Sequence, residues 1–200
     1  MGHKWVESAP CGIKAQHRFE DLALIAEVVQ AHRPDVAIEL GTAEGGFAAF
    51  LASVLADWGG RVVTFDRDVP PEITRLLAIS NLGYVQADLL REAHPSVLGL
   101  LRSAASPMLY CDNGAKMREL ALYAPWVPEG GLVGVHDYGT EVPPDLIEPL
   151  MRTLGYQPVR HEDFAALAHP EWYPVSLTRF WRRFAEDQDR RSVEVQWNLR

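Results

Sequence analysis

The sequence has little cysteine, no long apolar run and no excess of basic residues. Cys11 and Cys111 lie far apart and match no CxxC spacing, so neither a disulfide framework nor a structural zinc site is indicated. No stretch approaches the ~18 consecutive apolar residues of a membrane helix. The first residues carry charges where a signal peptide has its apolar stretch. We therefore expect a cytoplasmic protein that does not contact membranes.

The charge balance argues against a nucleic-acid partner. The formal net charge is −8, whereas proteins that neutralise many phosphates usually carry the opposite sign. The arginine-rich segment 179–191 is interleaved with acidic residues, which is typical of a solvated face. Hydrophobic residues make up 48% of the 200 residues, the mix of an ordinary globular protein. We predict one domain over 1–200, with an N-terminal extension at 1–18 and a C-terminal tail at 185–200.

Short apolar runs alternate with segments of helical periodicity along most of the chain, and this alternation is typical of βαβ units. The predicted helices cover 19–32, 47–55, 70–79, 93–103, 115–124 and 145–154. The predicted strands cover 36–40, 61–66, 84–88, 107–112, 130–138, 156–161 and 175–184. Right-handed crossovers between such strands build a parallel sheet that helices cover on both faces. The prediction is an α/β, doubly wound, mostly parallel Rossmann-like sheet whose late strands can be antiparallel.

Acidic residues stand at or near the end of each of the first five predicted strands. They are Glu39, Asp66, Asp88, Asp112 and Asp137. Ligands of open parallel sheets bind outside the carboxyl ends of the strands, so these side chains are candidates for a binding site. Each acid could instead cap the helix that follows it. Five acids together favour a ligand with a positive centre and several hydrogen-bond donors, with or without a metal ion.

The turn after the first strand contains three glycines, in the sequence ELGTAEGG (39–46). Glycine permits a positive φ and a close approach of the backbone to a ligand at a helix N-terminus. The dinucleotide fingerprint GxGxxG is not matched, and Glu44 stands where a pyrophosphate would be repelled. A nicotinamide cofactor is therefore disfavoured. Asp66 is placed to accept hydrogen bonds from a ribose in either case.

These motifs together resemble those of class I S-adenosylmethionine-dependent methyltransferases, over roughly residues 20 to 184. The resemblance implies that Glu39, Gly41, Thr42 and Gly45 surround the methionine part of the cofactor. It also implies that Asp66 holds the ribose hydroxyls and that Asp88 approaches the adenine amine. The sulfonium and ammonium groups of S-adenosylmethionine would offset the negative charge of the acids.

The segment 109–139 is similar to the cephalosporin-hydroxylase and catechol O-methyltransferase-like group of small-molecule methyltransferases. In that group acids after the fourth and fifth strands can hold a divalent ion, which here implies Asp112, His136 and Asp137 as ligands of Mg²⁺ or Mn²⁺. The catechol enzymes have Asp-Asn where this chain has Asp137-Tyr138. The other group tends to have Glu-Asp where this chain has His136-Asp137. Mg²⁺ prefers oxygen ligands, whereas Mn²⁺, Fe²⁺ and Zn²⁺ accept an imidazole.

Methyl transfer from a sulfonium needs a positioned, deprotonated nucleophile, and a hydroxyl is a poor one at pH 7. A metal ion or a nearby base would help, and Asp112, His136 and Asp137 could supply either. Lys116 could orient an acceptor oxygen or assist deprotonation. We predict O-methylation of a small molecule, a sugar, a phenol or another natural product, with His136, Lys116 and Asp137 as catalytic residues.

Two other functions stay open at this point. A nicotinamide-dependent oxidoreductase would use the same fold and Asp66, although no suitable Tyr-x-x-x-Lys pair occurs. A non-enzymatic nucleoside-binding module would keep the cofactor pocket without turnover. The chain has no separate substrate domain, so acceptor recognition would come from the N-terminal segment, the loop after Tyr138 or a neighbouring subunit of a homo-oligomer.

Overall fold

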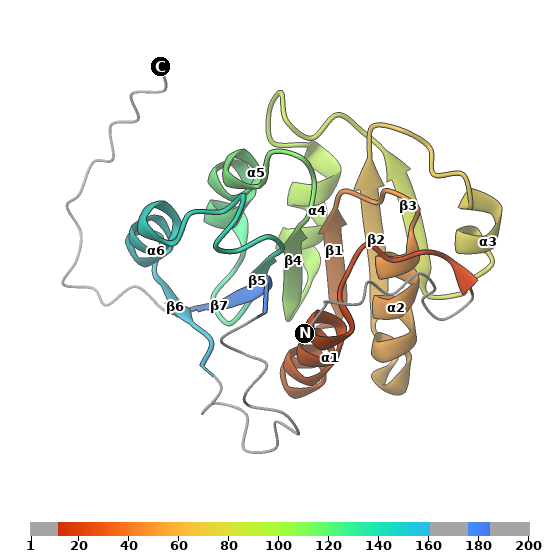
Figure 1. The fold of residues 1–200 in the computed structure, drawn as a ribbon, viewed down its shortest axis with the longest axis horizontal. Coiled ribbons are helices and arrows are strands. Elements are labelled where there is room, and N and C mark those ends of the chain that lie inside the picture. The colour runs from red at the N-terminus through yellow and green to blue at the C-terminus, as the bar shows by residue number, and fades with distance from the viewer. Residues whose placement is uncertain (1–11, 161–175, 185–200) are drawn as a thin grey trace.

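A seven-stranded sheet forms the centre of the computed structural model, which describes residues 12–160 and 176–184 (Figure 1). Its strand order is β3-β2-β1-β4-β5-β7-β6. The strands are β1 (Val36–Leu40), β2 (Arg61–Asp66), β3 (Leu82–Gln86), β4 (Pro107–Cys111), β5 (Leu132–Val135), β6 (Tyr156–Pro158) and β7 (Arg179–Arg183). The first five strands are parallel, and β7 pairs antiparallel with both β5 and β6. The predicted fold class, including the antiparallel late strands, is confirmed.

Helices cover both faces of this sheet. The α-helices are α1 (Phe19–His32), α2 (Gly46–Leu55), α3 (Ile73–Leu77), α4 (Pro95–Ser103), α5 (Lys116–Tyr123) and α6 (Pro144–Thr153). Two 3-10 turns, Ala56–Trp58 and Ala124–Trp126, extend α2 and α5. Neighbouring residues of β1 point to opposite faces: Ala37 packs in one core cluster with α1 and α2, and Ile38 in the other with α4, α5 and α6. None of the described helices is long and apolar enough to cross a membrane.

Most elements differ from their predicted bounds by one to four residues; the last two strands cover Tyr156–Pro158 and Arg179–Arg183 rather than 156–161 and 175–184. Three other differences have local reasons. The helix predicted at 70–79 covers only Ile73–Leu77, because the residue before a proline avoids the helical region and Pro71 follows Pro70. The third strand ends at Gln86 rather than 88, because its partner β2 ends at the register pair Asp66 and Gln86. The fifth strand is shorter than 130–138, because Gly130 (φ 80°) and Asp137 (φ 59°) both leave extended geometry.

The segment before α1 packs against the sheet rather than away from it. Ile13, Ala15 and His17 are buried, and the backbone N–H of Gly46, the first residue of α2, donates a hydrogen bond to the carbonyl of Lys14 at 3.1 Å. A Cβ atom on Gly46 would lie 2.1 Å from that carbonyl oxygen, so only glycine allows the approach. Residues 12–18 are thereby held over the start of α2. The predicted tail at 185–200 lies outside the described residues.

Candidate functional site

A cavity of about 620 Å³ lies over the carboxyl ends of β1, β4 and β5. The order of the strands reverses between β1 and β4, because β2 and β3 lie on one side of β1 while β4 and β5 lie on the other. Ligands of open α/β sheets bind at such a reversal point. Its walls come from four parts of the chain: residues 14–17, the glycine turn after β1, the turn after β4, and the turn after β5. The lining residues include Lys14, His17, Glu39, Gly41, Thr42, Phe47, Asp112, Asn113, Lys116, His136, Asp137 and Glu141.

The glycine turn passes very close to the turn after β4. A Cβ on Gly41 (φ 101°) would lie 2.7 Å from the Asp112 carbonyl oxygen, so a side chain there would force the two turns apart. Gly45 (φ 91°) occupies the N-cap position of α2, and Ala43 also has a positive φ of 48°. Of the residues of this turn that are predicted to bind the cofactor, Gly41 and Thr42 line the cavity and Gly45 does not. The backbone of this turn is therefore the surface that a ligand would meet.

Asp66 holds the glycine turn in place. Its Oδ2 accepts hydrogen bonds from the backbone N–H groups of Thr42 at 2.8 Å and Ala43 at 3.0 Å, and its Oδ1 accepts one from Asp68. Asp88 is exposed and accepts a hydrogen bond from the backbone N–H of Leu90. Neither side chain lines the cavity. Of the five strand-end acids, these two bind local backbone, while Glu39, Asp112 and Asp137 face the cavity.

Glu39 is a buried carboxyl group at the cavity wall with an unsatisfied oxygen. It is 1% exposed, and its Oε2 has no hydrogen-bond partner among the described residues. Burial raises the pKa of Glu39 well above its usual value, a hydrogen bond with Thr64 opposes this shift, and the nearby charges of Asp112 and Asp66 add to it. A cationic group bound in the cavity would relieve this unfavourable burial.

Lys116 joins three carboxylates at the other side of the cavity. Its Nζ lies 2.8 Å from Asp137 Oδ2, 2.9 Å from Glu141 Oε2 and 3.7 Å from Asp112 Oδ1. Burial lowers the pKa of Lys116, but the hydrogen bonds to Asp137 and Glu141 outweigh burial and raise it above its usual value. The side chain is a fixed, positively charged group. Asp137 reaches it from a left-handed backbone conformation (φ 59°), which Asp tolerates better than most residues.

His136 follows β5 and turns its Nδ1 toward two carboxylates. The distances are 3.3 Å to Asp112 Oδ1 and 3.4 Å to Asp137 Oδ2. Burial lowers the pKa of His136, whereas hydrogen bonds to Asp112 and Asp137 raise it more strongly, to about 9. Its Nε2 is buried and has no hydrogen-bond partner among the described residues. The structure thus brings together all four residues predicted at the acceptor end, Asp112, Lys116, His136 and Asp137.

His17 is a site residue that the sequence analysis did not identify. It lies before α1, stacks on Phe47 with ring centroids 4.2 Å apart, and places Nε2 3.5 Å from Asp112 Oδ2. Burial and the neighbouring His136 hold its pKa well below the usual value, so the ring is neutral. The strand-end pattern could not reveal His17, because no strand precedes it. The only signal is the glycine pair 45–46, which permits the close packing of residues 12–18.

A larger cavity, about 720 Å³, lies at the opposite edge of the sheet beside the start of β5. It is lined by side chains such as His32, Arg152 and Arg182, and contains none of the predicted site residues. Ligands of open α/β sheets bind outside the carboxyl ends of the parallel strands, whereas this cavity lies beside the amino end of β5. The smaller cavity is therefore the better candidate for the chemistry.

Solved structures confirm the fold. A structure of CmcI with S-adenosylhomocysteine (SAH) is 18% identical, has a TM-score of 0.61 and covers 87% of this chain and 81% of its own. A structure of CmcI with Mg and S-adenosylmethionine is 18% identical, with a TM-score of 0.60 over 87% of this chain and 75% of its own. A methyltransferase from Geobacter sulfurreducens is 15% identical, with a TM-score of 0.57 over 82% and 78%.

A search of the curated proteins found no match. A family model, described as rhamnosyl O-methyltransferase/CmcI, matches residues 4–153, which include the glycine turn and all the predicted site residues. This match supports the methyltransferase interpretation over a nicotinamide-dependent oxidoreductase or a non-enzymatic nucleoside-binding module. The chain therefore belongs to the rhamnosyl O-methyltransferase/CmcI family.

Proposed function

We propose that this O-methyltransferase uses the cavity over β1, β4 and β5 to transfer the methyl group of S-adenosylmethionine to a hydroxyl group of a small molecule. One observation carries the assignment. The cavity has a buried, unsatisfied carboxyl group at one wall, Glu39, and a fixed cation, Lys116, at the other. The first suits a cationic cofactor, and the second suits an acceptor oxygen on which negative charge develops.

The cofactor end is built from the glycine turn and Glu39. The ammonium of the methionine part can bind the unpartnered Oε2 of Glu39, and a charge-assisted hydrogen bond of this kind is among the stronger ones in proteins. Gly41 and Thr42 offer backbone at the cavity wall, where glycine leaves room for a close approach. Gly45 contributes through its positive φ, which allows the turn to enter α2.

The nucleoside end rests on the resemblance. Asp66 is assigned the ribose and Asp88 the adenine, and the contacts of Asp66 support a second role for it. Because its Oδ2 fixes the N–H groups of Thr42 and Ala43, Asp66 determines the shape of the turn that the cofactor meets. A carboxylate has about four acceptor positions, so one hydrogen bond from a ribose hydroxyl can be added to the three from the backbone.

The acceptor end consists of Lys116, His136 and Asp137. Methyl transfer is an in-line displacement, so the acceptor oxygen must lie opposite the sulfonium and lose its proton. Lys116 is anchored by Asp137 and Glu141, so its charge is fixed where the acceptor oxygen becomes negative. His136 is held at Nδ1 by Asp112 and Asp137, so its unpartnered Nε2 points away from these carboxylates. In the deprotonated form of the ring, which the pKa of about 9 favours at alkaline pH, Nε2 can accept the proton that the acceptor hydroxyl loses.

The predicted ligand set Asp112, His136 and Asp137 does not fit magnesium. His136 offers nitrogen rather than oxygen, and the carboxylate of Asp137 lies 2.8 Å from the Lys116 ammonium, whereas Mg²⁺ needs near-octahedral oxygen ligands. The proposed reaction therefore does not depend on magnesium. We propose a sugar hydroxyl as the acceptor, because the family is described as rhamnosyl O-methyltransferase/CmcI. The hydroxyl groups of phenols and other natural products are alternative acceptors for the same reaction.

Calorimetric titration of SAH into the chelator-treated protein tests the cofactor, with NAD as the control ligand. We expect SAH to bind and NAD not to bind. Glu39→Gln should weaken SAH binding by about 1 to 3 kcal/mol, because a charge-assisted hydrogen bond to the ammonium is lost. Glu72→Gln, a change at a surface pair with Arg75, is the matched control and should leave the affinity unchanged. Tight NAD binding, or no SAH binding, would refute the proposed function.

A further inference from the structure

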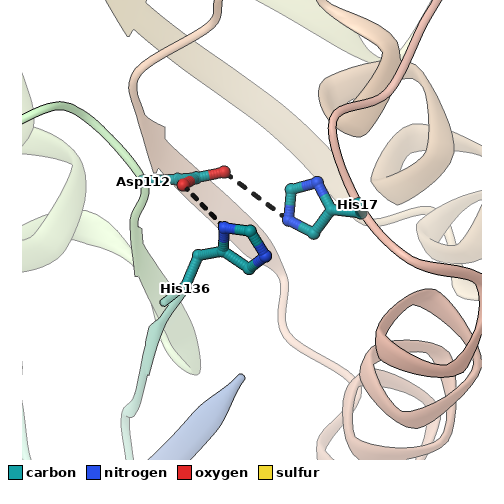
Figure 2. Close-up of side chains that lie close together, drawn as sticks. All are labelled: His17, Asp112 and His136. Carbon is teal, nitrogen blue, oxygen red and sulfur yellow. Dashed lines mark ion pairs between the residues drawn. The ribbon is translucent and has the colours of Figure 1, made fainter. Parts of the chain in front are cut away.

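Two histidine rings converge on one carboxylate beside the acceptor end of the cavity (Figure 2). His17 comes from the segment before α1, Asp112 from the end of β4 and His136 from the end of β5. Each residue offers one ligand atom, and these three atoms lie within 4.8 Å of one another. In Figure 2 both rings turn a nitrogen toward the carboxylate of Asp112. Two imidazoles and one carboxylate are the ligand types of a transition-metal site.

The two N···O distances, which end on different oxygens of Asp112, are long for hydrogen bonds and also fit ligand atoms around an ion. His17 Nε2 lies 3.5 Å from Asp112 Oδ2, and His136 Nδ1 lies 3.3 Å from Asp112 Oδ1. Charge-assisted N–H···O bonds are usually shorter, at about 2.7 to 2.9 Å. Ligand atoms bonded to one ion at about 2.1 Å stand roughly 3.0 to 3.4 Å apart in octahedral or tetrahedral geometry. The two observed distances are close to the upper end of that range.

Packing holds the two rings in this arrangement. His17 is 1% exposed and stacks on Phe47 with an interplanar angle of 13°, and its ring centroid lies 4.3 Å from that of His136, which is 4% exposed. Neither ring can rotate away without disrupting the core around it. The Tyr110 hydroxyl lies 3.4 Å from His17 Nε2 and adds a long hydrogen bond that positions this ring. The second nitrogen of each ring, His17 Nδ1 and His136 Nε2, is buried and lacks a hydrogen-bond partner among the described residues.

The third ligand is His17 rather than Asp137. The Asp137 carboxylate lies 2.8 Å from the Lys116 ammonium, which Glu141 also contacts, so a metal ion on Asp137 would have to displace a salt bridge. Asp112 is 3.7 Å from the same ammonium, and its two oxygens face the histidines. The chain therefore separates two cation positions, an ammonium at Asp137 and a second position between His17, Asp112 and His136.

We propose that His17, Asp112 and His136 bind a divalent ion that accepts imidazole, such as Zn²⁺, Co²⁺, Mn²⁺ or Fe²⁺, and that Mg²⁺ binds there poorly. Three ligands leave further coordination positions open toward the cavity, where an acceptor oxygen or water can bind; this part rests on the proposed function. Ligation by His17 also ties residues 12–18 to the ends of β4 and β5. The ion thus links the N-terminal segment to the site.

The test is direct metal binding to the chelator-treated protein. Calorimetry with Zn²⁺ and with Mg²⁺, together with the visible absorption of bound Co²⁺, should show one site that takes Zn²⁺ and Co²⁺ and has at least about 100-fold weaker affinity for Mg²⁺. His17→Gln and Asp112→Asn should each weaken Zn²⁺ binding by at least about tenfold. His32→Gln, which changes a histidine of α1 outside the cluster, is the matched control and should keep the affinity.

A second measurement covers the case in which a variant of the buried His17 fails to fold. X-ray absorption of the wild-type protein with one equivalent of Zn²⁺ should show two imidazole ligands. An oxygen-only shell, equal affinity for Mg²⁺ and Zn²⁺, a folded His17→Gln protein with unchanged affinity, or no stoichiometric binding of any of these ions would each overturn the inference. SAH titration of the metal-free protein separates the two proposals, because SAH binding without metal binding removes only the metal site.

Discussion

Replacing Glu119 by Gln should stabilise the protein at alkaline pH and leave it almost unchanged at acidic pH. Glu119 lies on α5 beneath the turn after β4 and is fully buried, with 0% exposure. One carboxyl oxygen accepts a long 3.4 Å hydrogen bond from the backbone N–H of Asn113, and the other has no partner among the described residues. Burial raises the pKa of Glu119 from 4.5 to about 7. The folded protein therefore holds this proton more tightly than the unfolded chain does.

The sign and size of the effect follow from this difference in pKa. Below pH 4.5 the carboxyl group is protonated in both states, and no penalty arises. Between pH 4.5 and 7 the unfolded chain releases this proton while the folded protein retains it, so stability falls over this range; above pH 7 the folded protein buries a carboxylate and the loss is complete. The difference of 7 − 4.5 = 2.5 pH units corresponds to about 3 kcal/mol at 1.36 kcal/mol per unit. Gln keeps the shape and an acceptor oxygen for Asn113 but never becomes charged, so the variant lacks this loss.

Urea unfolding of both proteins at pH 5 and pH 8 measures the effect. We expect the stability difference between Glu119→Gln and wild type to shift by about 2.5 kcal/mol in favour of the variant between the two pH values, because part of the loss is already present at pH 5. The exposed Glu129→Gln variant is the control for a loss of surface charge and should show no such shift. If Glu119→Gln differs from wild type by the same amount at both pH values, the argument from burial is wrong.

Three further predictions concern the site itself. Asp66→Ala should weaken SAH binding by about 1 to 3 kcal/mol in calorimetry, because the glycine turn loses its carboxylate anchor; unchanged affinity would remove Asp66 from the site. Asp137→Ala should abolish methyl transfer in a radiolabel assay while SAH binding stays near the wild-type value, and full activity would refute our assignment of the acceptor end. Gly41→Ala should lower stability in thermal unfolding by about 1 kcal/mol or more, because of its φ of 101° and the 2.7 Å approach to Asp112; Gly99→Ala, which has open space around it, should not.

The sequence predicted the sheet well because alternating apolar runs and helical periodicity are local signals. The order of strands follows from right-handed crossovers, which bring the ends of β1 and β4 together. Bounds were less accurate where the end of an element depends on its neighbour. The third strand stops where its partner β2 stops, and the apolar run from Tyr84 to Asp88 contains no information about that register.

The strand-end acids show what a sequence pattern can and cannot predict. That Glu39, Asp112 and Asp137 meet at one cavity follows from the parallel arrangement, because β1, β4 and β5 are neighbours in the sheet. Asp66 ends β2 and Asp88 follows the end of β3, yet both bind backbone N–H groups: Asp66 those of the glycine turn and of Asp68, and Asp88 that of Leu90. The pattern does not distinguish a carboxylate that faces a ligand from one that holds a turn, because both stand at the same place along a strand.

The position of His17 depends on packing that no local pattern reveals, and it changes the charge balance of the site. Asp112, Asp137 and Glu141 surround one ammonium, Lys116, so the cluster carries an excess of negative charge at distances below 4 Å. Unit charges 4 Å apart interact by about 4 kcal/mol near a protein surface, so this excess needs a second positive charge. A proton on His136 supplies one charge, whereas a divalent ion between His17, Asp112 and His136 supplies two. Lys116 makes its two short ion pairs with Asp137 and Glu141, so the carboxylate without a close cation is Asp112, the one that both histidines face.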